Sequence, residues 1–469
     1  MAGAVLLLCA GTAIAAPAQM FEPLADFDGG NGQWPYASLV QGRDGKLYGT
    51  TSAGGTADGG TVFRVAPTGH ETVLYGFVGI SNGYRPTTAL VLATDGNFYG
   101  TTDEGNNPEC PPDHCGTVFR INPKGILSTL HVFERTDGSF PSGLIEASDG
   151  NLYGTAQGGG NMFCTFPDYG CGTVFRITPS GVLTTLYQFC IEADCRDGAG
   201  PSGGLVEGPE GSFYGTTIEG GTSTNCFFGC GTVFKITREG ALTTLHSFIN
   251  SDGIEPVAGL IQGEDGDFYG STSYGGADNL GTIFKITHEG LLTTLHNFYA
   301  FDGAEPLAAL IQATDGNLYG TTYMGGLEGT YGTIFKMTPD GTITTLHEFD
   351  VTDGGGPNGL VQGTDGKLYG TAFAGGTFND GTVFTLDVGL GPCVAFVRPA
   401  GEVGQTGGIL GQGFTGTTGV SLNGIPASFT VVSDTFIKAT VPAGATTGFV
   451  TVVTPSGTLT SNVPFHVIP

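Results

Sequence analysis

The sequence predicts an all-β protein in which a seven-bladed β-propeller is followed by a small immunoglobulin-like β-sandwich. The first observation is a repeat: the motifs [LF]-Y-G and G-T-[VI]-F each occur seven times, with a period of 50 residues where no insertion intervenes. Repetition at this period is typical of propellers and other repeat folds. The second is composition, because 39% hydrophobic residues and 84 glycines at recurring positions indicate tight turns around a buried core.

Four short signatures in each repeat predict the four strands of a blade, which we name A to D from the propeller axis outward. Strand A is a small, mostly uncharged run such as residues 359–362, and strand B contains [LF]-Y-G. Strand C contains G-T-[VI]-F, and strand D carries the signature L-x-x-F. The β-branched and aromatic residues favour strands, whereas the D-G, G-G and P-x-G sequences between them favour turns.

The order of these signatures predicts how the ring closes. The chain begins with a strand D over residues 22–27, and its last strand C ends near Asp387. The N-terminal strand would therefore complete blade seven and remove an exposed strand edge. We expect the propeller over residues 19–388. The repeat signatures stop at about Gly389, and short alternating segments with frequent turn residues predict the sandwich over residues 392–469.

The N-terminus predicts export. An apolar segment from Val5 to Ile14 precedes two A-x-A cleavage sites, so residues 1–18 are expected to be a signal peptide. No later segment is long and apolar enough to span a membrane, and we expect a monomer that is secreted or held at the cell surface. The net charge of −27 argues against nucleic acid and anionic lipid as partners.

The cysteines support an oxidising compartment. Of the nine cysteines that remain after cleavage of the expected signal peptide, eight form four close pairs in the sequence, and Cys393 is left over with no assigned role. In an exported protein such pairs predict local disulfides. Zinc is the alternative, although the spacings differ from the paired two-residue spacing of zinc ribbons. The pairs are Cys110/Cys115, Cys164/Cys171, Cys190/Cys195 and Cys226/Cys230.

The repeat resembles a known family. Its consensus, D-G-x-[LF]-Y-G-[TS]-T-x-x-G-G followed by G-T-[VI]-F-[KR]-[IVM]-T-P-x-G, is similar to the GloVer tandem repeat of secreted bacterial proteins and covers residues 21–387. Members of that family often carry a C-terminal surface anchor. The tail resembles the IPT/TIG fold at Pro399, residues 411–414 and residues 465–467. Neither resemblance implies an enzymatic reaction, and the second implies a spacer or an adhesion module.

The candidate binding site is predicted from the blades whose loops differ from the repeat. The A–B and C–D loops are uniform, whereas the B–C loops of blades two to four are longer and each contains a cysteine pair. A fourth pair lies in the D–A loop between blades three and four. Loops on a rigid scaffold commonly hold binding sites, although these insertions could equally pack their own aromatic rings. The aromatic candidates for ligand binding are Phe163, Phe166, Tyr169, Phe227 and Phe228.

Other polar patterns give weaker predictions. An Asp or Asn precedes Gly in every D–A loop and could bind Ca²⁺, but Asp-Gly is also ordinary turn chemistry, so we expect no cofactor. The sequence contains no G-x-S-x-G, H-E-x-x-H or P-loop motif and assigns no catalytic residue or metal ligand. A spatial pair of carboxylates leaves no sequence trace, and Glu104, Glu146, Glu207 and Glu219 are the acids that stand out.

Three functions remain open at this stage. The first is a non-enzymatic binding or adhesion protein that presents the D–A/B–C loop face of blades two to four to an extracellular glycan or protein. The second is an extracellular carbohydrate-active enzyme, a lyase or glycoside hydrolase, that uses carboxylates on the same face. The third is a structural surface component.

Overall fold

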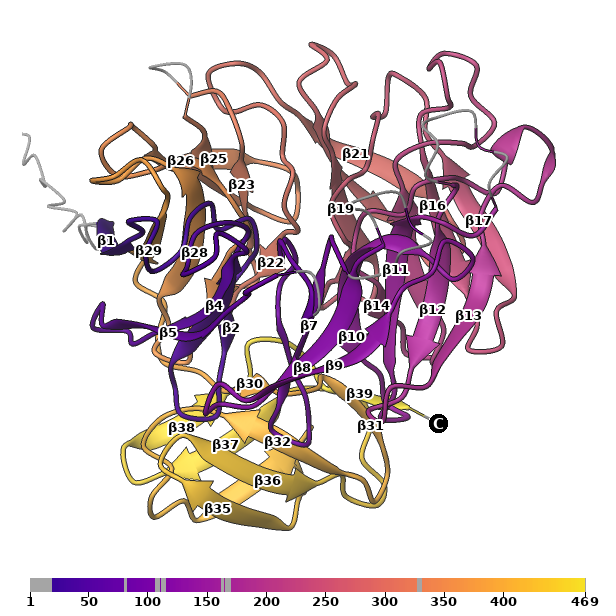
Figure 1. The fold of residues 1–469 in the computed structure, drawn as a ribbon. Coiled ribbons are helices and arrows are strands. Elements are labelled where there is room, and N and C mark those ends of the chain that lie inside the picture. The colour runs from indigo at the N-terminus through magenta and orange to yellow at the C-terminus, as the bar shows by residue number, and fades with distance from the viewer. Residues whose placement is uncertain are drawn as a thin grey trace, which may run out of the picture.

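The computed structural model describes residues 19–79, 82–105, 110, 115–161, 164, 170–326 and 331–468. These residues form seven antiparallel sheets that follow one another along the chain, and a smaller β-rich tail beneath them (Figure 1). A short 3-10 turn, Ala193–Cys195, lies in the D–A loop between blades 3 and 4. The described part of the chain contains no helix long and apolar enough to cross a membrane.

Each sheet is one blade with the predicted strand order. Strands A are β2 (Val40–Gln41), β6 (Val91–Leu92), β10 (Ser139–Glu146), β14 (Val206–Glu207), β18 (Ile261–Gln262), β22 (Ile311–Gln312) and β27 (Val361–Gln362), with β26 (Gly355–Pro357) beside the last. Strands B are β3 (Leu47–Thr51), β7 (Phe98–Thr102), β11 (Leu152–Gly158), β15 (Phe213–Thr217), β19 (Phe268–Thr272), β23 (Leu318–Thr322) and β28 (Leu368–Ala374).

The outer half of each blade consists of strands C and D, which recur in all seven blades. Strands C are β4 (Thr61–Val65), β8 (Thr117–Ile121), β12 (Thr173–Ile177), β16 (Thr232–Ile236), β20 (Thr282–Ile286), β24 (Thr333–Met337) and β29 (Thr382–Asp387). Strands D are β5 (Glu71–Gly76), β9 (Leu127–Val132), β13 (Leu183–Gln188), β17 (Leu242–Ser247), β21 (Leu292–Asn297), β25 (Ile343–Glu348) and, for blade 7, β1 (Met20–Asp26).

The residues of the repeat signatures explain why these strands form. Strand B is buried along its whole length in blade 1, and its tyrosine, Tyr48, is 1% exposed. The Tyr48 hydroxyl donates to the Asp44 carboxylate of the A–B turn at 3.1 Å, and the equivalent pair recurs in every blade. The following glycine, Gly49, is required because a Cβ there would lie 2.6 Å from the ring of Phe63 in strand C.

A belt of hydroxyl groups joins the blades into a closed ring of seven. In each blade a strand B hydroxyl donates to a backbone carbonyl in or shortly before the next blade's strand A, at 3.0 or 3.1 Å. The pairs are Thr50–Thr88, Thr101–Pro141, Thr155–Gly203, Thr216–Ala258, Ser271–Pro306, Thr321–Asn358 and Thr371–Ala37. The fold is therefore the expected seven-bladed propeller.

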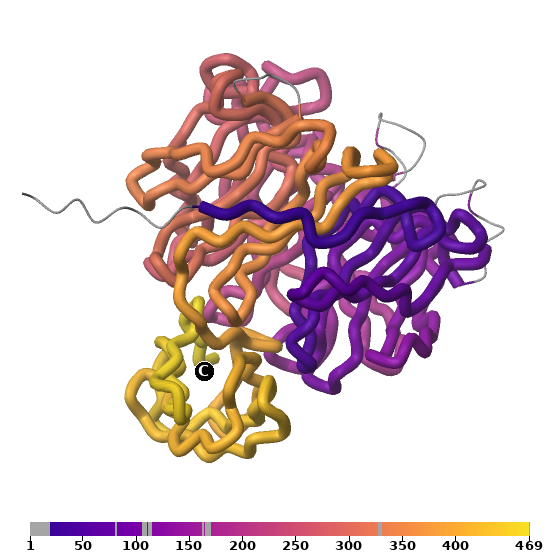
Figure 2. The backbone as a smooth tube through the Cα atoms, turned by 90° about the vertical axis from the view of Figure 1, so that its left-hand side faces the viewer, coloured from indigo at the N-terminus to yellow at the C-terminus, as the bar shows by residue number. Residues whose placement is uncertain are grey.

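The N-terminal strand completes blade 7, as the order of signatures predicts. Strand β1 pairs antiparallel with β29, with Phe21 opposite Leu386 and Asp26 opposite Thr382. Figure 2 shows the indigo strand running alongside the orange blade. Phe27, directly after β1, is fully buried in the cluster between blades 7 and 1. The observed strand starts at Met20, two residues before the expected start.

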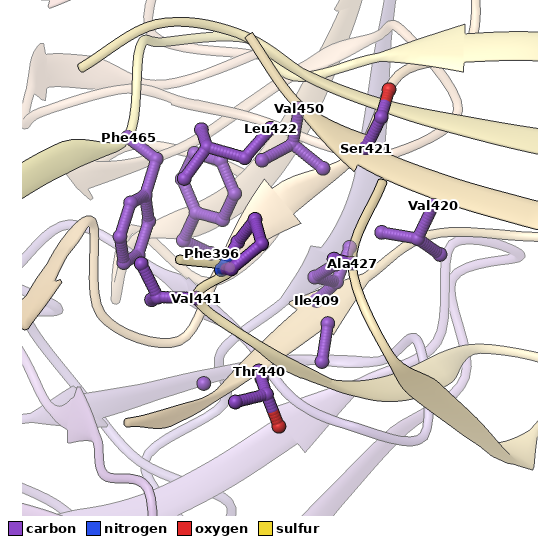
Figure 3. Close-up of a pocket in the computed structure, with 14 residues that line it drawn as sticks. Phe396, Ile409, Val420, Ser421, Leu422, Ala427, Thr440, Val441, Val450 and Phe465 are labelled. Carbon is purple, nitrogen blue, oxygen red and sulfur yellow. The ribbon is translucent and has the colours of Figure 1, made fainter. Parts of the chain in front are cut away.

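The tail is a β-sandwich. One sheet contains β30 (Ala395–Phe396), β32 (Thr406–Leu410), β36 (Phe436–Thr440) and β35 (Phe429–Ser433), and the other contains β34 (Ile425–Pro426), β33 (Gly419–Leu422), β37 (Val450–Thr454) and β38 (Gly457–Thr460). Strands β31 (Ala400–Glu402) and β39 (His466–Ile468) pair in parallel. A gap of about 30 Å³ between its sheets, lined mainly by apolar side chains, has room for roughly one water molecule and is a packing feature (Figure 3).

The tail is docked against the propeller. Arg398 is 8% exposed and donates through Nη1 to the carbonyl oxygen of Ala147 in blade 3 at 3.1 Å. In blade 1, the Arg43 guanidinium stacks 4.5 Å from the Phe436 ring centre. Buried Phe436 also belongs to the apolar cluster between blades 1 and 2. The tail therefore covers the A–B/C–D face and leaves the variable loops on the opposite face.

Candidate functional site

The four expected disulfides are present, and three of them lie side by side over blades 3 and 4. Cys164–Cys171 closes the B–C loop of blade 3, Cys190–Cys195 closes the following D–A loop, and Cys226–Cys230 closes the B–C loop of blade 4. Cys110–Cys115 closes the B–C loop of blade 2. Among the described residues the remaining cysteine is Cys393, which is buried.

The sulfur atoms of Cys164, Cys171 and Cys190 lie within 4.8 Å of one another. Zinc binding is the alternative to disulfides for these cysteines. A zinc ligand must be a thiolate, and sulfur atoms shared in disulfides have none to offer. The close approach has a different consequence: it fixes the blade 3 loop against the D–A loop that leads into blade 4. Backbone hydrogen bonds add to it, since Gly200 N–H donates to Cys171 O at 2.9 Å.

A hollow of about 710 Å³ opens among these loops, and we call it the stapled hollow. Cys164, Cys190, Cys195 and Cys226 contribute to its wall. The other lining side chains are mostly polar or aromatic: Asp194, Arg196, Glu219, Thr222, Ser223, Thr224, Phe227 and Phe228. A volume of this size fits a small ligand of roughly drug size.

The two predicted aromatic residues of blade 4 lie in this hollow. Phe227 is 93% exposed and stands perpendicular to Phe228, with the ring centres 4.5 Å apart. Phe228 is anchored through its carbonyl oxygen, which accepts the Gly220 N–H at 2.7 Å. Exposing a phenylalanine ring to water is unfavourable, so such a ring on a rigid loop is suited to contact a ligand. The other three predicted residues, Phe163, Phe166 and Tyr169, lie outside the described residues.

Glu219 is the chemically distinctive residue of the stapled hollow. It follows strand β15, and its backbone exchanges two hydrogen bonds with Ala199 of the D–A loop. Burial, with a smaller contribution from the negative charge of Glu255, raises the pKa of Glu219 to about 7. Within the described part of the chain no group hydrogen-bonds its carboxylate. Strongly perturbed acids without a structural partner are enriched at functional sites.

The other singled-out acids have structural roles. Glu146 accepts both the N–H and the hydroxyl of Thr94, and Glu207 accepts both groups of Ser148. Both lie at the A–B end of the propeller, so their departure from the repeat does not place them at the variable loops. Glu104 is at the variable face, where it forms an ion pair of 3.2 Å with Arg85.

The D–A aspartates are also engaged within their own blades. Asp137, Asp252, Asp302 and Asp353 each hydrogen-bond the strand D histidine of the same blade at 2.9 to 3.1 Å. Each also caps a backbone N–H three residues earlier. Asp197 instead accepts from Tyr187 at 2.9 Å. The repetition thus serves loop closure, which accounts for both the aspartates and the histidines.

An aromatic group that the sequence analysis missed lies across the same face. Trp34 and Tyr36 in the D–A loop of blade 1 are 39% and 42% exposed. The ring of Phe373, at the end of strand B in blade 7, is 4.6 Å from Tyr36 and 5.9 Å from Trp34. A signal was available, because Trp34 is the only tryptophan of the chain. Only the closed ring brings residue 373 beside residues 34 and 36.

A comparison with known protein families agrees with the repeat. The model of the Gloeobacter/Verrucomicrobia repeat matches residues 13–228 and again residues 220–425. No curated protein matches the chain.

Among solved structures, the chain is similar to the extracellular domain of a putative hybrid two-component system from Bacteroides thetaiotaomicron, with 11% identity, a TM-score of 0.49, and coverage of 92% of this chain and 51% of that one. It is also similar to PorZ, a surface component of the type-IX secretion system of Porphyromonas gingivalis, at 14% identity, TM-score 0.48, and 94% and 60% coverage. A putative 6-phosphogluconolactonase from Bacteroides fragilis gives 18% identity, TM-score 0.45, and 70% and 88% coverage. These likenesses concern the fold alone.

Proposed function

Because this chain belongs to the Gloeobacter/Verrucomicrobia repeat family and carries four disulfides, we propose that it is an extracellular binding protein whose ligand is a glycan. Disulfides are typical of exported proteins, which supports an extracellular or surface location. The glycan would bind in the stapled hollow. A signal peptide over residues 1–18, a propeller over residues 19–388, an IPT/TIG-like tail over residues 392–469 and a monomeric state are parts of the same proposal.

One observation carries the assignment: a half-buried carboxyl group with no hydrogen-bond partner among the described residues and an almost fully exposed phenylalanine line the same hollow. Phe227 offers an apolar ring face to the C–H face of a sugar. Glu219, with its pKa near 7, can accept a hydrogen bond from a sugar hydroxyl or donate one. Arg196, Thr222 and Thr224 add exposed donors and acceptors. The disulfides hold these groups in place, so little conformational entropy is lost on binding.

The test is a glycan array probed with the purified full chain, followed by affinity measurements on variants. We expect Phe227→Ala to weaken binding about tenfold, because a stacked aromatic contact contributes about 1 kcal/mol beyond its buried area. Phe378→Ala is the matched control, because Phe378 is 58% exposed in the B–C loop of blade 7, away from the stapled hollow. Equal affinity of the parent and the Phe227→Ala variant, with both folded, would refute this site.

A carbohydrate-active enzyme is the second candidate, and Glu219 favours it. Burial raises the pKa of Glu255 as well, and the charge of Glu255 contributes to the raised pKa of Glu219, so two perturbed carboxyl groups lie at the same face. Paired carboxyl groups of which one stays protonated near neutral pH are what glycoside hydrolysis requires. Glu219→Gln separates the candidates. A lectin-like protein would keep affinity within a few-fold, whereas a hydrolase would lose turnover of the bound glycan and retain binding.

A further inference from the structure

Seven structurally equivalent residues surround the propeller axis on the D–A/B–C face, one in each D–A loop. Each has a left-handed backbone, with φ between 51° and 63°, and each is followed by a buried proline. We call this set the pre-proline ring: Trp34, Arg85, Phe140, Gly200, Glu255, Glu305 and Gly356.

The loop fixes this conformation whichever residue occupies the position. In blade 2, Arg85 N–H donates to Gly59 O, and Asp103 N–H donates to Arg85 O, both at 3.0 Å. Glu255 in blade 5 makes the same two backbone bonds, at 3.1 and 3.0 Å. The loops therefore clamp the residue between strand ends of adjoining blades.

Glycine is the unstrained choice at such a φ, and blades 4 and 7 use it. A residue with a Cβ costs roughly 1–2 kcal/mol in the left-handed region. The other five blades therefore keep side chains that backbone geometry does not require. Stored strain of this kind clusters at functional sites. The side chains themselves differ from blade to blade, so architecture alone does not explain them.

The pre-proline ring is most distinctive around Trp34. Trp34, Tyr36, Phe373 and Tyr323 form what we call the aromatic cluster, contributed by blades 1, 7 and 6. Tyr323 fits beside Gly356, where a Cβ would lie 2.5 Å from its ring. The Phe373 ring is inclined at about 35° to both Trp34 and Tyr36. The two flanking rings stay more than a third exposed, so the group presents open ring surface to solvent.

Polar groups border the aromatic cluster. Arg85 and Glu104 pair at 3.2 Å, and the Thr87 hydroxyl donates to Asp103 at 2.6 Å. Asp103 and Arg85 lie close enough to Tyr36 to influence its hydroxyl electrostatically. The surface thus combines aromatic faces with hydrogen-bonding groups at their edge, the combination that suits a ligand with an apolar face and a polar rim.

We propose that the aromatic cluster is a second saccharide-binding site, on the opposite side of the pre-proline ring from the stapled hollow, and that it takes a neutral oligosaccharide. A pyranose ring has a C–H face for the indole and phenol rings and hydroxyl groups for the polar border. The net charge of −27, with Glu255 and Glu305 on the same ring, disfavours anionic sugars. The aromatic cluster is separate from the stapled hollow, so the two proposed sites can be tested independently.

The single tryptophan makes this proposal directly testable, because all tryptophan fluorescence of the chain comes from Trp34. The full chain would be titrated with the hexaoses of cellulose, xylan, mannan, laminarin and chitin. We expect saturable quenching or a spectral shift with at least one of them, and a tenfold or larger loss of affinity in Tyr36→Leu. Phe301→Ala is the control, because Phe301 is 61% exposed in another D–A loop.

The results of this titration can be distinguished from those of the binding experiments on the stapled hollow. Phe227→Ala should leave the fluorescence titration unchanged even if it abolishes binding on the array. If Tyr36→Leu does not fold, Phe373→Leu is to be measured instead, because it keeps the apolar volume while removing the ring. No response to any of the neutral hexaoses, or unchanged affinity in the folded variant, would overturn the proposal.

Discussion

The hydroxyl group of Thr371 in blade 7 donates a 3.0 Å hydrogen bond to the carbonyl oxygen of Ala37 in blade 1. An equivalent bond joins the neighbouring blades at each of the six remaining junctions, so the junction between blades 7 and 1 is built like the rest. Its integrity depends on β1, because the buried Phe27 beside this junction arrives with that strand.

Removing β1 should therefore open the ring. A chain that begins at residue 28 loses the pairing with β29 and the burial of Phe27, and we expect its free energy of unfolding to fall by more than about 5 kcal/mol. A chain that begins at residue 19 is the control and should match the parent. Thermal unfolding measures both. Similar midpoints for the two chains would mean that β1 is not part of the closure.

A second prediction concerns two glutamines at equivalent positions in strand A. Gln312 Oε1 accepts the Glu264 N–H of the preceding blade at 2.8 Å, whereas the buried Gln262 Oε1 has no partner among the described residues. The residue corresponding to Glu264 in blade 4 is Pro209, which has no N–H to donate. Gln312→Ala should cost about 1 kcal/mol more than Gln262→Ala in chemical denaturation. Equal costs would contradict this account.

The Glu219 carboxyl should make stability depend on pH. Its pKa in the folded chain is about 7, above the ordinary value of 4.5, so the folded state holds this proton more tightly than the unfolded state. Its stabilising contribution is complete below about pH 4.5 and is lost as the pH rises to about 7. Glu219→Gln should flatten the stability profile over this range and be the more stable chain at pH 8.

The matched control for that experiment is Glu104→Gln. Glu104 occupies the equivalent place in blade 2 but is paired with Arg85. Comparing the two substitutions shows whether a change in slope between pH 5 and pH 7 is specific to Glu219. Parallel profiles of the parent and the Glu219→Gln variant would show that Glu219 titrates normally.

Arg398 should hold the tail in place. Its guanidinium donates to Ala147 O in blade 3 and to Gln405, which itself reaches Ser148 O at 3.3 Å. Arg398→Ala leaves these buried acceptors without a charged donor and should destabilise docking by about 2–3 kcal/mol. Hydrogen exchange should then rise at residues 147–148. Lys438→Ala, at an exposed position of the tail, should leave that exchange unchanged.

Cys393 should be chemically silent in the folded chain. Burial raises the pKa of its thiol to about 12, and its Sγ lies 3.7 Å from the Gly363 carbonyl oxygen. A thiol reagent such as Ellman's should therefore react with Cys393 only after unfolding. The experiment uses a chain that begins at residue 19, because residues 1–18 contain a further cysteine, Cys9. Rapid reaction under native conditions would place Cys393 at the surface.

The repeat made the fold predictable because each blade carries a sequence signature for each of its four strands. Tyr48 and its six equivalents identify strand B in every blade. The single strand D that precedes the first complete blade, β1, predicts that the ring closes at blade 7. The docking of the tail was not predictable, since Arg398 meets Ala147 only after both units have folded. A free spacer and a docked sandwich have the same local sequence pattern.

The candidate site was predictable only in part. The cysteine pairs located the stapled loops, because sequence-local disulfides need no tertiary information. The pKa of Glu219 depends on burial and on Glu255, which a different blade supplies, and no residue pattern records that proximity. The aromatic cluster was overlooked for the same reason. Aligning the residue before each proline would have shown Trp34 in register with two glycines and two glutamates.

The pairing of β1 with β29 has a consequence for biosynthesis. A chain made from its N-terminal end delivers β1 as the first strand of the propeller and its partner β29 as the last, so the edge of residues 20–26 stays unpaired until residue 387 has emerged. An unpaired edge of this kind can pair with another copy, so this interval is when a chaperone would be needed. The disulfides span at most seven residues and can form long before that. The disulfides can therefore form loop by loop, while the propeller ring closes in a single later step.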